Sequence, residues 1–408
     1  MAGTDTMTPL LAYPHDTMAP ERRWDAPWTL AETPAALGTV APVPAPALRC
    51  VRLHTGAATA GHDLATRRSV ARSLALLLGC PFEDGTPAAE GDRSYLVPTE
   101  TLIGFEAAAR LGVRGPDDLF GGIVPHAFVA TKVITHPLVA AHAAAPAGWS
   151  ARFSERVRGV VLPGFAVFSA ADARRALRRL LADGAVRVKS PDGVGGGGQS
   201  VVGDATPFET LLSTIDPAQL ARDGLVLERN LSRVQTCSVG QVRVGPFCAS
   251  YVGVQGLVPD HAGREVYGGS RLRVVRGDFD ALLRRPLART DRLAVEQALV
   301  YHAAACEEYG VVASRANYDI AQGLDESGRW RSGVLEQSWR IGGASGAEVA
   351  ALFAFQADPA LESVTASTHE VYAEHPVPPP GAQVHFDDTD PQAGRLLKYA
   401  QLDTDAQP

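Results

Sequence analysis

Polar residues recur at every second position in two strand-like segments of the last third of the chain. The first segment, residues 311–321, carries Arg315, Asn317 and Asp319, and the second, residues 333–340, carries Glu336, Ser338 and Arg340. Side chains of a strand alternate between its two faces. If the strands are neighbours, about 4.8 Å apart, Asp319 and Glu336 can share one oxygen-liking cation, with arginines beside it for anionic groups. The pattern predicts a site that handles phosphate with magnesium.

A glycine-dense segment provides a second candidate for phosphate chemistry. It follows a predicted strand, residues 185–189, that ends in Lys189, and it reads Ser-Pro-Asp-Gly-Val-Gly-Gly-Gly-Gly-Gln-Ser over residues 190–200. Glycine leaves backbone amides open and lets a loop fold closely around a polyanion. Lys189 can reach phosphate oxygens as a point charge. The segment is not a Walker loop, because no Gly-Lys-Ser/Thr follows it; for the glycines alone, a flexible hairpin or linker is equally compatible.

The composition favours a protein that acts on small molecules. The 408 residues, 46% of them hydrophobic, can bury a large core and form two or three domains. A formal net charge of −7 gives no electrostatic reason to expect a nucleic acid or an anionic membrane as partner. The five cysteines are scattered and never spaced as CxxC, which favours reduced thiols and a cytoplasmic location. We expect neither a membrane span nor a signal peptide.

The elements that position these residues divide the chain into four regions. Residues 1–47 are rich in proline and predict an extended arm or linker. Residues 48–121 predict a small α/β lead-in domain, with a strand at 50–53 and a helix that ends at Gly79. Residues 122–355 include a helix with a capping-box-like start at Ser169, the strand before the glycine loop, and a strand at 225–228. Residues 356–408 form a C-terminal extension.

A lysine strand, a glycine loop, a strand ending in Glu228 and a late carboxylate pair follow one another in a single order. This order resembles the ATP-grasp superfamily over residues 122–355. The chain looks most like a family of bacterial proteins of unknown function that are described only as ATP-grasp-like. The resemblance implies an α/β (α+β) fold in which two lobes, about residues 122–230 and 231–355, clasp ATP between them. It implies ATP and Mg²⁺ as cofactors but no particular substrate.

The resemblance also assigns nucleotide contacts to individual residues. The residues that match cofactor-binding positions are Lys132, Lys189, Gly195, Gly196, Gly197, Gly198, Glu228 and Gln235. The two lysines match those that contact the phosphates, and the glycines, within residues 193–198, match the loop that closes over them. Glu228 matches the position that holds the adenine amino group. Gln235 lies near a position that usually supplies a ribose-binding glutamate, and glutamine there departs from the family pattern.

The metal site and the arginines are assigned in the same way. Asp319 and Glu336 match the magnesium carboxylates, and Ser338 replaces the usual asparagine with a shorter oxygen ligand. Arg340 matches the arginine of a motif that ends in small residues, here residues 341–345. Arg315 is a further candidate for the reaction, although Asp319 and Glu336 could instead form a structural ion-pair network with these two arginines.

Three further features are less specific. Arg271, with Arg273, lies on one face of a predicted strand and could bind phosphate or an acidic substrate, or could be part of a basic surface strand. His302 is predicted to be a packing histidine rather than a base. The acidic run at residues 386–390 lies in a proline-rich, weakly patterned end and is predicted to be solvated and disordered.

The activity implied by the resemblance is that of a Mg²⁺-dependent ligase. It would activate a substrate carboxylate as an acyl phosphate, which an amine or similar nucleophile then attacks. Two alternatives stay open: a kinase that stops after phosphoryl transfer, and a nucleotide-binding regulatory protein that has lost turnover, as Ser338 and Gln235 would allow. A homodimer would be compatible with this architecture.

Overall fold

The structure is a computed structural model, and it describes residues 48–56, 60–85, 93–191, 193 and 198–403. The predicted arm at 1–47 and three of the glycines assigned to the nucleotide, Gly195, Gly196 and Gly197, lie outside the described residues. Strands and helices from all other regions combine into a mixed α/β architecture, which confirms the predicted fold class. The domain boundaries at 121 and 355 stay predictions. Within the described residues, every helix is too short or too polar to cross a membrane.

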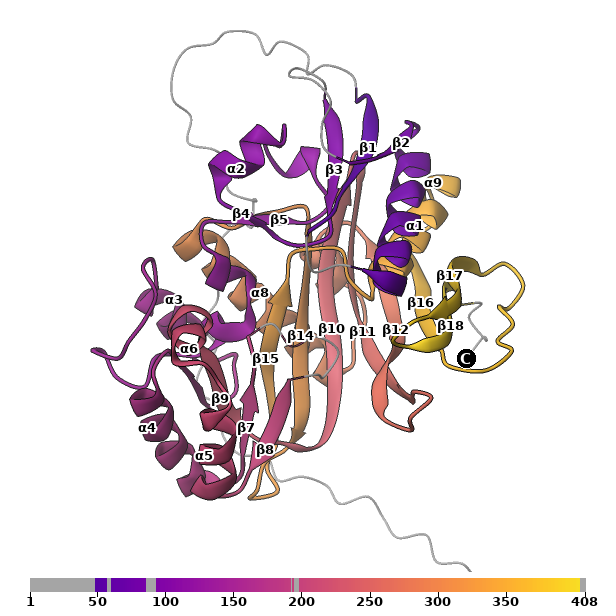
Figure 1. Ribbon diagram of the computed structural model, residues 1–408. Coiled ribbons are helices and arrows are strands. Elements are labelled where there is room, and N and C mark those ends of the chain that lie inside the picture. The colour runs from indigo at the N-terminus through magenta and orange to yellow at the C-terminus, as the bar shows by residue number, and fades with distance from the viewer. Residues whose placement is uncertain (1–47, 57–59, 86–92, 192, 194–197, 404–408) are drawn as a thin grey trace, which may run out of the picture. The chain divides into compact units, whose positions relative to one another are not determined.

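An antiparallel sheet of eight strands forms the centre of the described chain, in the order β15-β14-β10-β11-β12-β16-β18-β17 (Figure 1). Its strands are β10 Ser232–Val244, β11 Phe247–Pro259, β12 Glu265–Arg276, β14 Arg315–Leu324, β15 Trp330–Ser338, β16 Ser363–Val371, β17 Gln383–Asp390 and β18 Gly394–Leu402. The two segments with alternating polar residues are β14 and β15, which are neighbours at one edge of the sheet. The pairing on which the predicted metal site depends is therefore confirmed.

The two faces of this sheet have different coverings because successive side chains point to opposite sides. Helices α7 Phe279–Leu283 and α8 Arg289–Tyr309 pack on one face, where Val239, Tyr318 and Ile320 join the hydrophobic core. Helices α1 Gly61–Leu78 and α9 Ser345–Ala357 cover part of the other face, over Tyr251 and Leu272. The polar residues of β14 lie on this second face, beyond the helices.

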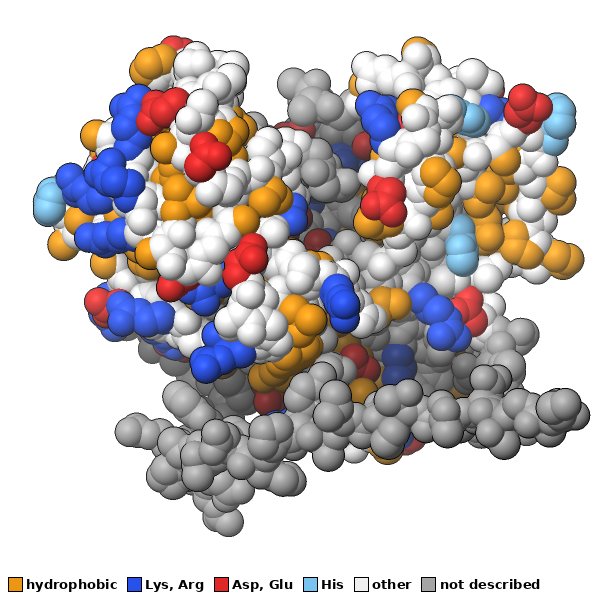
Figure 2. Space-filling view, turned by 90° about the horizontal axis from the view of Figure 1, so that it is seen from below, with side chains coloured by type: hydrophobic (Ala, Val, Ile, Leu, Met, Phe, Trp, Pro, Cys, Tyr) orange, Lys and Arg blue, Asp and Glu red, His pale blue; other side chains and the backbone are white. Residues whose placement is uncertain are grey.

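A smaller antiparallel sheet carries Lys189 and Glu228. Its order is β6-β9-β7-β8, with β6 Gly164–Val167, β7 Val186–Lys189, β8 Gln199–Val202 and β9 Leu225–Arg229. The accompanying helices are α3 Ala151–Val157, α4 Ala170–Leu180, α5 Ala205–Ser213 and α6 Pro217–Asp223. The predicted start of α4 is confirmed, since the Ser169 hydroxyl accepts a hydrogen bond from the Asp172 amide. Basic side chains gather at the left of Figure 2, on the side of the molecule where the arginine-rich helix α4 lies.

The lead-in region contains a parallel sheet, β2-β1-β3, followed by a second small sheet, β13-β5-β4. The strands are β1 Cys50–His54, β2 Phe82–Asp84, β3 Ser94–Pro98, β4 Leu102–Ile103, β5 Gly122–Val124 and β13 Val312–Ala313, with α2 Phe105–Arg110 after β4. Four 3-10 helices complete the secondary structure of the described residues: η1 Pro116–Asp118, η2 Ala127–Ala130, η3 Lys132–Thr135 and η4 Leu181–Asp183. As predicted, α1 ends at Gly79, whose φ of 66° is left-handed.

The prediction that residues 386–390 are disordered is wrong. They belong to β17, which pairs with β18 at the edge of the large sheet and contacts α1. Asp390 is buried, and its carboxylate accepts a hydrogen bond from the His62 amide at the start of α1. The acidic run thus has one solvated face and one face that the fold uses, which its composition alone does not reveal.

Candidate active site

The two predicted magnesium carboxylates lie directly opposite each other. Asp319 of β14 is the register partner of Glu336 of β15, and Asn317 is the partner of Ser338. The register shifts just after Asp319, between Asp319 and Ile320, so a bulge adjoins the carboxylate pair. Directly opposed side chains of an antiparallel pair lie close enough to share a ligand. The arrangement therefore presents two acidic side chains and one hydroxyl on the same face of the sheet.

Asp319 is held in place by three donors. Its Oδ1 accepts hydrogen bonds from Gln255 Nε2 at 2.8 Å, Asn317 Nδ2 at 2.8 Å and Ser238 Oγ at 3.2 Å. Burial and the neighbouring Glu336 raise the pKa of Asp319, while these hydrogen bonds act in the opposite direction. All three donors meet the same oxygen, so the second oxygen is available to a cation. A cation here would relieve the repulsion between the two carboxylates.

Lys132 brings the glycine loop to the metal carboxylates. It is the first residue of η3, and its Nζ lies 2.5 Å from Glu336 Oε2. The same ammonium donates a hydrogen bond of 2.6 Å to the carbonyl of Gly193, at the start of the loop. A lysine in this position can neutralise phosphate charge beside the metal. Its contact with a phosphate stays a prediction.

Lys189 and Glu228 form a second, deeper pair. The two residues lie on the same face of the small sheet, on neighbouring strands β7 and β9, and both are almost fully buried. Lys189 Nζ forms an ion pair with Glu228 Oε1, and His136 Nε2 lies 3.0 Å from Glu228 Oε2. Burial raises the pKa of Glu228, but the opposing effect of Lys189 and His136 is larger and lowers the pKa to about 2. Glu228 is thus charged at neutral pH, with each oxygen paired to a protein group, and its contact with adenine stays a prediction.

His136 was not among the predicted site residues. It follows η3 and is fully buried, with Gly164 so close that a β-carbon there would lie 2.8 Å from the imidazole ring. The only signal in the sequence is its position four residues after Lys132 and directly before Pro137. Its approach to Glu228 joins segments that are far apart in the chain, and no local pattern reveals such a contact.

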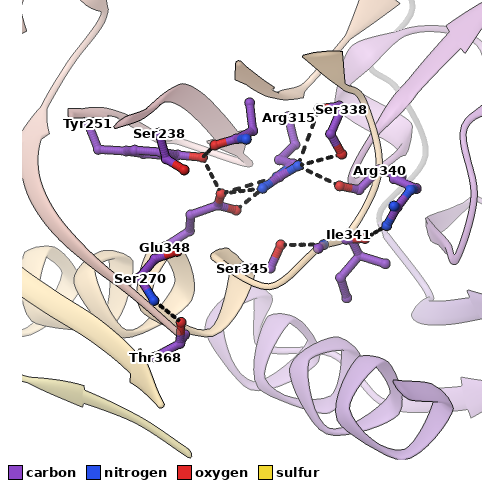
Figure 3. Close-up of polar contacts among 12 residues, drawn as sticks. Ser238, Tyr251, Ser270, Arg315, Ser338, Arg340, Ile341, Ser345, Glu348 and Thr368 are labelled. Carbon is purple, nitrogen blue, oxygen red and sulfur yellow. Dashed lines mark hydrogen bonds and ion pairs between the residues drawn. The ribbon is translucent and has the colours of Figure 1, made fainter. Parts of the chain in front are cut away.

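Arg315 is directed at the protein rather than at a ligand (Figure 3). Its Nη2 lies 2.7 Å from Glu348 Oε1 of α9, and its Nη1 donates a 2.6 Å hydrogen bond to the Arg340 carbonyl. The side chains of Arg315 and Glu348 are both buried. Arg315 therefore ties the loop after β15 to α9, and we interpret it as a positioning residue instead of the predicted catalytic one.

Arg340 lies in that loop with its guanidinium beside a cavity. Among the described residues its one hydrogen-bond acceptor is the Ile341 carbonyl, at 3.0 Å. Burial and the nearby Arg67 and Arg315 lower the pKa of Arg340 to about 10. Arg67 reaches the same cavity from α1 and donates a hydrogen bond to the Thr99 carbonyl. Two arginines held this closely favour an anion between them.

The cavity has a volume of about 420 Å³ and opens on the polar face of the large sheet. Its walls come from the start of α1, the strands β12, β14 and β15, the loop after Arg340, and the strands β16 to β18. Asp319, Glu336 and Ser338 are among the lining residues. The predicted metal ligands and Arg340 thus share one cavity with residues of the lead-in and C-terminal regions.

The structure does not bring Arg271 or Gln235 to this cavity. Arg271 follows the cavity-lining Ser270 on β12 and therefore points to the opposite face, where it pairs with Asp403 at 2.7 Å. Gln235 is exposed, opposite Gln322 in the register, on the face of β10 that does not carry Ser238. For Arg271 the strand was predicted correctly, but which of its faces borders the cavity depends on tertiary packing.

The remaining predicted residues lie as follows. Gly198 closes the glycine loop, because its carbonyl accepts a hydrogen bond from the Ser190 amide, and its φ of 69° favours glycine. The loop joins β7 to β8, which are antiparallel neighbours, so it is the connection of a hairpin. His302 donates to or accepts from the Tyr318 hydroxyl at 2.6 Å, on the helix-covered face of the sheet. Burial lowers the pKa of His302 to about 4, in keeping with the predicted packing role.

Several solved structures resemble the chain at low sequence identity. Phosphoribosylamine–glycine ligase from Thermotoga maritima is 14% identical, with a TM-score of 0.48 over 87% of this chain and 93% of that chain. Biotin carboxylase from Campylobacter jejuni, solved as a β-γ-ATP complex, is 11% identical, with a TM-score of 0.47 over 88% of each chain. D-alanine–D-alanine ligase from Bacillus anthracis is 11% identical, with a TM-score of 0.41 over 72% of this chain and 87% of that chain. Since each TM-score is below 0.5, we derive a function from the site itself.

The sequence comparisons point to one family. None of the curated proteins compared with the chain matches it. A family model described as "Protein of unknown function (DUF3182)" matches residues 50–400. Because this match spans most of the chain, the protein belongs to the DUF3182 family.

Proposed function

We propose that the protein is a Mg²⁺-dependent ligase of the ATP-grasp type, which activates a carboxylate with ATP for attack by an amine or a similar nucleophile. The observation that supports this most directly is the Asp319–Glu336 pair, which faces a cavity together with Arg340 and is connected by Lys132 to the glycine loop. This one arrangement combines a candidate metal site, a phosphate-contacting lysine and an anion-binding arginine.

The described residues fit Mg²⁺ when a nucleotide is also bound. Mg²⁺ is usually held by one or two carboxylates together with substrate phosphates and water. Asp319 and Glu336 provide two carboxylates, and Ser338 can add a hydroxyl. Within the described part of the chain, no group of three or more His, Cys, Asp or Glu side chains could hold a metal by itself. This is the donor set expected where phosphate oxygens complete the shell.

The proposal assigns the nucleotide base to the small sheet, beside Glu228. Glu228 is negatively charged at neutral pH and fixed between Lys189 and His136. A carboxylate can accept the hydrogen bond of an adenine amino group, and Lys189 is close enough to Glu228 to contact the same nucleotide. The loop that begins at Ser190 and ends at Gly198 lies directly beyond Lys189. Closure of this loop over ATP would exclude water.

The proposed reaction has two steps. In the first, an oxygen of the substrate carboxylate attacks the γ-phosphorus, and ADP leaves as the bond between the β- and γ-phosphates breaks. In the second, the nucleophile attacks the acyl carbon, loses its proton, and releases inorganic phosphate. Bound Mg²⁺ would neutralise charge on the phosphates. Arg340 orients the carboxylate, Lys132 neutralises phosphate charge, and Arg315 keeps the loop of Arg340 in place.

Calorimetric titration with a non-hydrolysable ATP analogue tests this proposal. Wild-type protein should bind the analogue more tightly with Mg²⁺ than without it, and Glu336→Gln should lose most of this Mg²⁺ dependence. Glu209→Gln is a matched control, because it removes an exposed carboxylate of the small lobe that pairs with Arg174 on the neighbouring helix. No binding to wild-type protein, or an undiminished Mg²⁺ effect in Glu336→Gln, would contradict the assignment.

A trapping experiment then separates a ligase from a kinase. In the presence of an acid that the protein accepts as a substrate, hydroxylamine should intercept the acyl phosphate as a hydroxamate, while ADP and phosphate are released together. A stable phosphorylated product that resists hydroxylamine would instead identify a kinase.

A further inference from the structure

Part of the cavity wall comes from outside residues 122–355, the part of the chain that resembles ATP-grasp proteins. The start of α1 contributes His62, Asp63 and Arg67, and the C-terminal strands contribute Glu370 and Lys398. These residues lie where the substrate, rather than the nucleotide or the metal, would be recognised. Their charges therefore carry information about the class of substrate.

One side of this wall is positive. Arg67 and Arg340 both line the cavity, and the first residues of α9 lie beside them. The one acidic side chain in the first turn of α9, Glu348, is paired with Arg315. Gly342 and Gly343 precede this helix and let the backbone approach the cavity closely. This side fits the carboxylate of a substrate, close to the metal site where the carboxylate would be activated.

The other side of the wall has an excess of negative charge. Lys398 Nζ lies 3.1 Å from Asp63 Oδ1 and 3.0 Å from Glu370 Oε1, so one ammonium joins two carboxylates. Lys398 is buried, and Glu370 Oε2 also accepts a hydrogen bond of 3.3 Å from the Tyr372 hydroxyl. These three side chains have a formal charge of −1, Glu370 and Lys398 are register partners of β16 and β18, and His62 Nδ1 lies 3.3 Å from Asp63 Oδ1. The cluster fits a positively charged group of the substrate.

A buried histidine adds an unused hydrogen-bonding atom. His385 of β17 is 8% exposed and lines the cavity. Its Nδ1 lies 3.0 Å from the Ser69 hydroxyl, whereas its Nε2 is buried without a hydrogen-bond partner among the described residues. A buried polar atom without a partner is costly. This histidine therefore supports the interpretation of the cavity as a binding site for a polar molecule.

From these three features we infer that the acid activated in this cavity is a small zwitterion, an amino acid or a short peptide. Its carboxylate faces Arg340 and Arg67, and its ammonium group faces Asp63 and Glu370. This inference rests on the proposed function, because it assigns a substrate class to the same site. The cavity volume of about 420 Å³ is within the range of small-molecule pockets, and it suits a ligand of this size.

The test measures phosphate release by the full-length protein with Mg²⁺ and ATP. The probes are the common amino acids and a set of dipeptides, each paired with the same acid without its amino group. We expect at least one zwitterion to stimulate phosphate release, with kcat/KM at least roughly tenfold above that of its desamino partner. A roughly tenfold ratio is what one charged hydrogen bond to the ammonium group would contribute.

Two variants locate the recognition of the ammonium group. Glu370→Gln removes one carboxylate while Lys398 keeps Asp63 as its partner, and Asp63→Asn makes the reciprocal change. Each should lower kcat/KM for the zwitterion by roughly tenfold or more, mainly through KM, and leave the desamino acid little changed. Glu209→Gln serves as the control. Unchanged affinity for the ATP analogue shows that each variant is folded.

The outcomes separate this inference from the proposed function. Suppose that wild-type protein binds the ATP analogue with Mg²⁺. If desamino acids stimulate phosphate release as strongly as zwitterions do, or if no zwitterion of the panel stimulates it, the inference is wrong and the proposed function stands. If wild-type protein does not bind the nucleotide, both are wrong.

Discussion

Two lysine–glutamate pairs are placed in very different surroundings. Lys189 and Glu228 of the small sheet have side-chain exposures of 3% and 1%, and His136 completes their contacts. Lys132 and Glu336 have exposures of 5% and 31%, and the carboxylate borders the cavity. The first pair is closed to solvent, whereas the second has an open carboxylate. The same two residue types thus form one fixed element of the lobe and one contact that a ligand can rearrange.

The difference has consequences for stability. Breaking a buried ion pair leaves a charge without a partner in a medium that solvates it poorly. A partly exposed carboxylate loses little when its partner moves, because water replaces the contact. We therefore expect the Lys189–Glu228 pair to contribute to the stability of the fold, and the Lys132–Glu336 pair to contribute to binding.

The largest expected effect is that of Glu228→Gln on stability. Because Lys189 would stay buried without its carboxylate, the free energy of unfolding should fall by about 3–5 kcal/mol, as measured by urea denaturation followed by circular dichroism. Glu336→Gln is the matched change in the open pair and should cost less, because Lys132 keeps the Gly193 carbonyl as an acceptor and the repulsion between Glu336 and Asp319 is removed. Equal losses in the two variants would show that the contrast in burial has no energetic consequence.

A pH titration of stability addresses the same pair. The pKa of Glu228 is lowered from the model-compound value of 4.5 to about 2 in the folded protein. Its contribution is therefore complete above pH 4.5 and is lost as the pH falls toward 2, for a total of about 3 kcal/mol. Burial lowers the pKa of His302 and of His385 to about 4. Because unfolding lets these histidines take up protons, they destabilise the folded state as the pH falls from 6.5 toward 4, above the range in which Glu228 acts.

The contribution of Glu228 to stability is therefore obtained by comparing wild type with Glu228→Gln over the acid pH range. Wild type and Glu228→Gln should lose stability in parallel between pH 6.5 and about 4.5, where the histidines titrate. Below that range the wild type should lose more, so that the two curves converge. Parallel curves throughout the acid range would mean that the carboxylate is not stabilised by its partners.

Much of this site could be predicted because strand periodicity is local. The alternation in β14 and β15 places Asp319 and Glu336 on one face, and the order of the strands along the chain made their pairing a reasonable expectation. The same alternation correctly placed Arg271 and Arg273 on one face of β12. It did not show that this face points away from the cavity. Which face a strand buries is decided by elements distant in sequence, here α1 and α9.

Long-range contacts explain the other differences. Arg315 has the residue type of a substrate-binding arginine, and only the approach of α9 shows that Glu348 and the Arg340 carbonyl occupy it. The C-terminal strands contain acidic residues and follow a proline-rich stretch, so their composition suggested disorder. Their pairing with one another and with β16, the neighbour of β12, nevertheless makes them a wall of the cavity.

A smaller effect than that of Glu228→Gln concerns His136, the third member of the closed cluster. His136→Leu removes the hydrogen bond to Glu228 but leaves the ion pair with Lys189. We expect a loss of about 1–3 kcal/mol in the free energy of unfolding and a rise in the pKa of Glu228. His136→Gln, which keeps a donor group, should recover part of this loss.

Nucleotide affinity of the same two variants tests whether the cluster also acts in binding. If the cluster only stabilises the lobe, nucleotide affinity should be unchanged in both variants; if it also orients Glu228 toward the base, affinity should fall in His136→Leu and recover in His136→Gln. Similar stability of wild type and His136→Leu would show that Lys189 alone keeps Glu228 charged, and that the contrast between the two pairs lies in burial rather than in the number of partners.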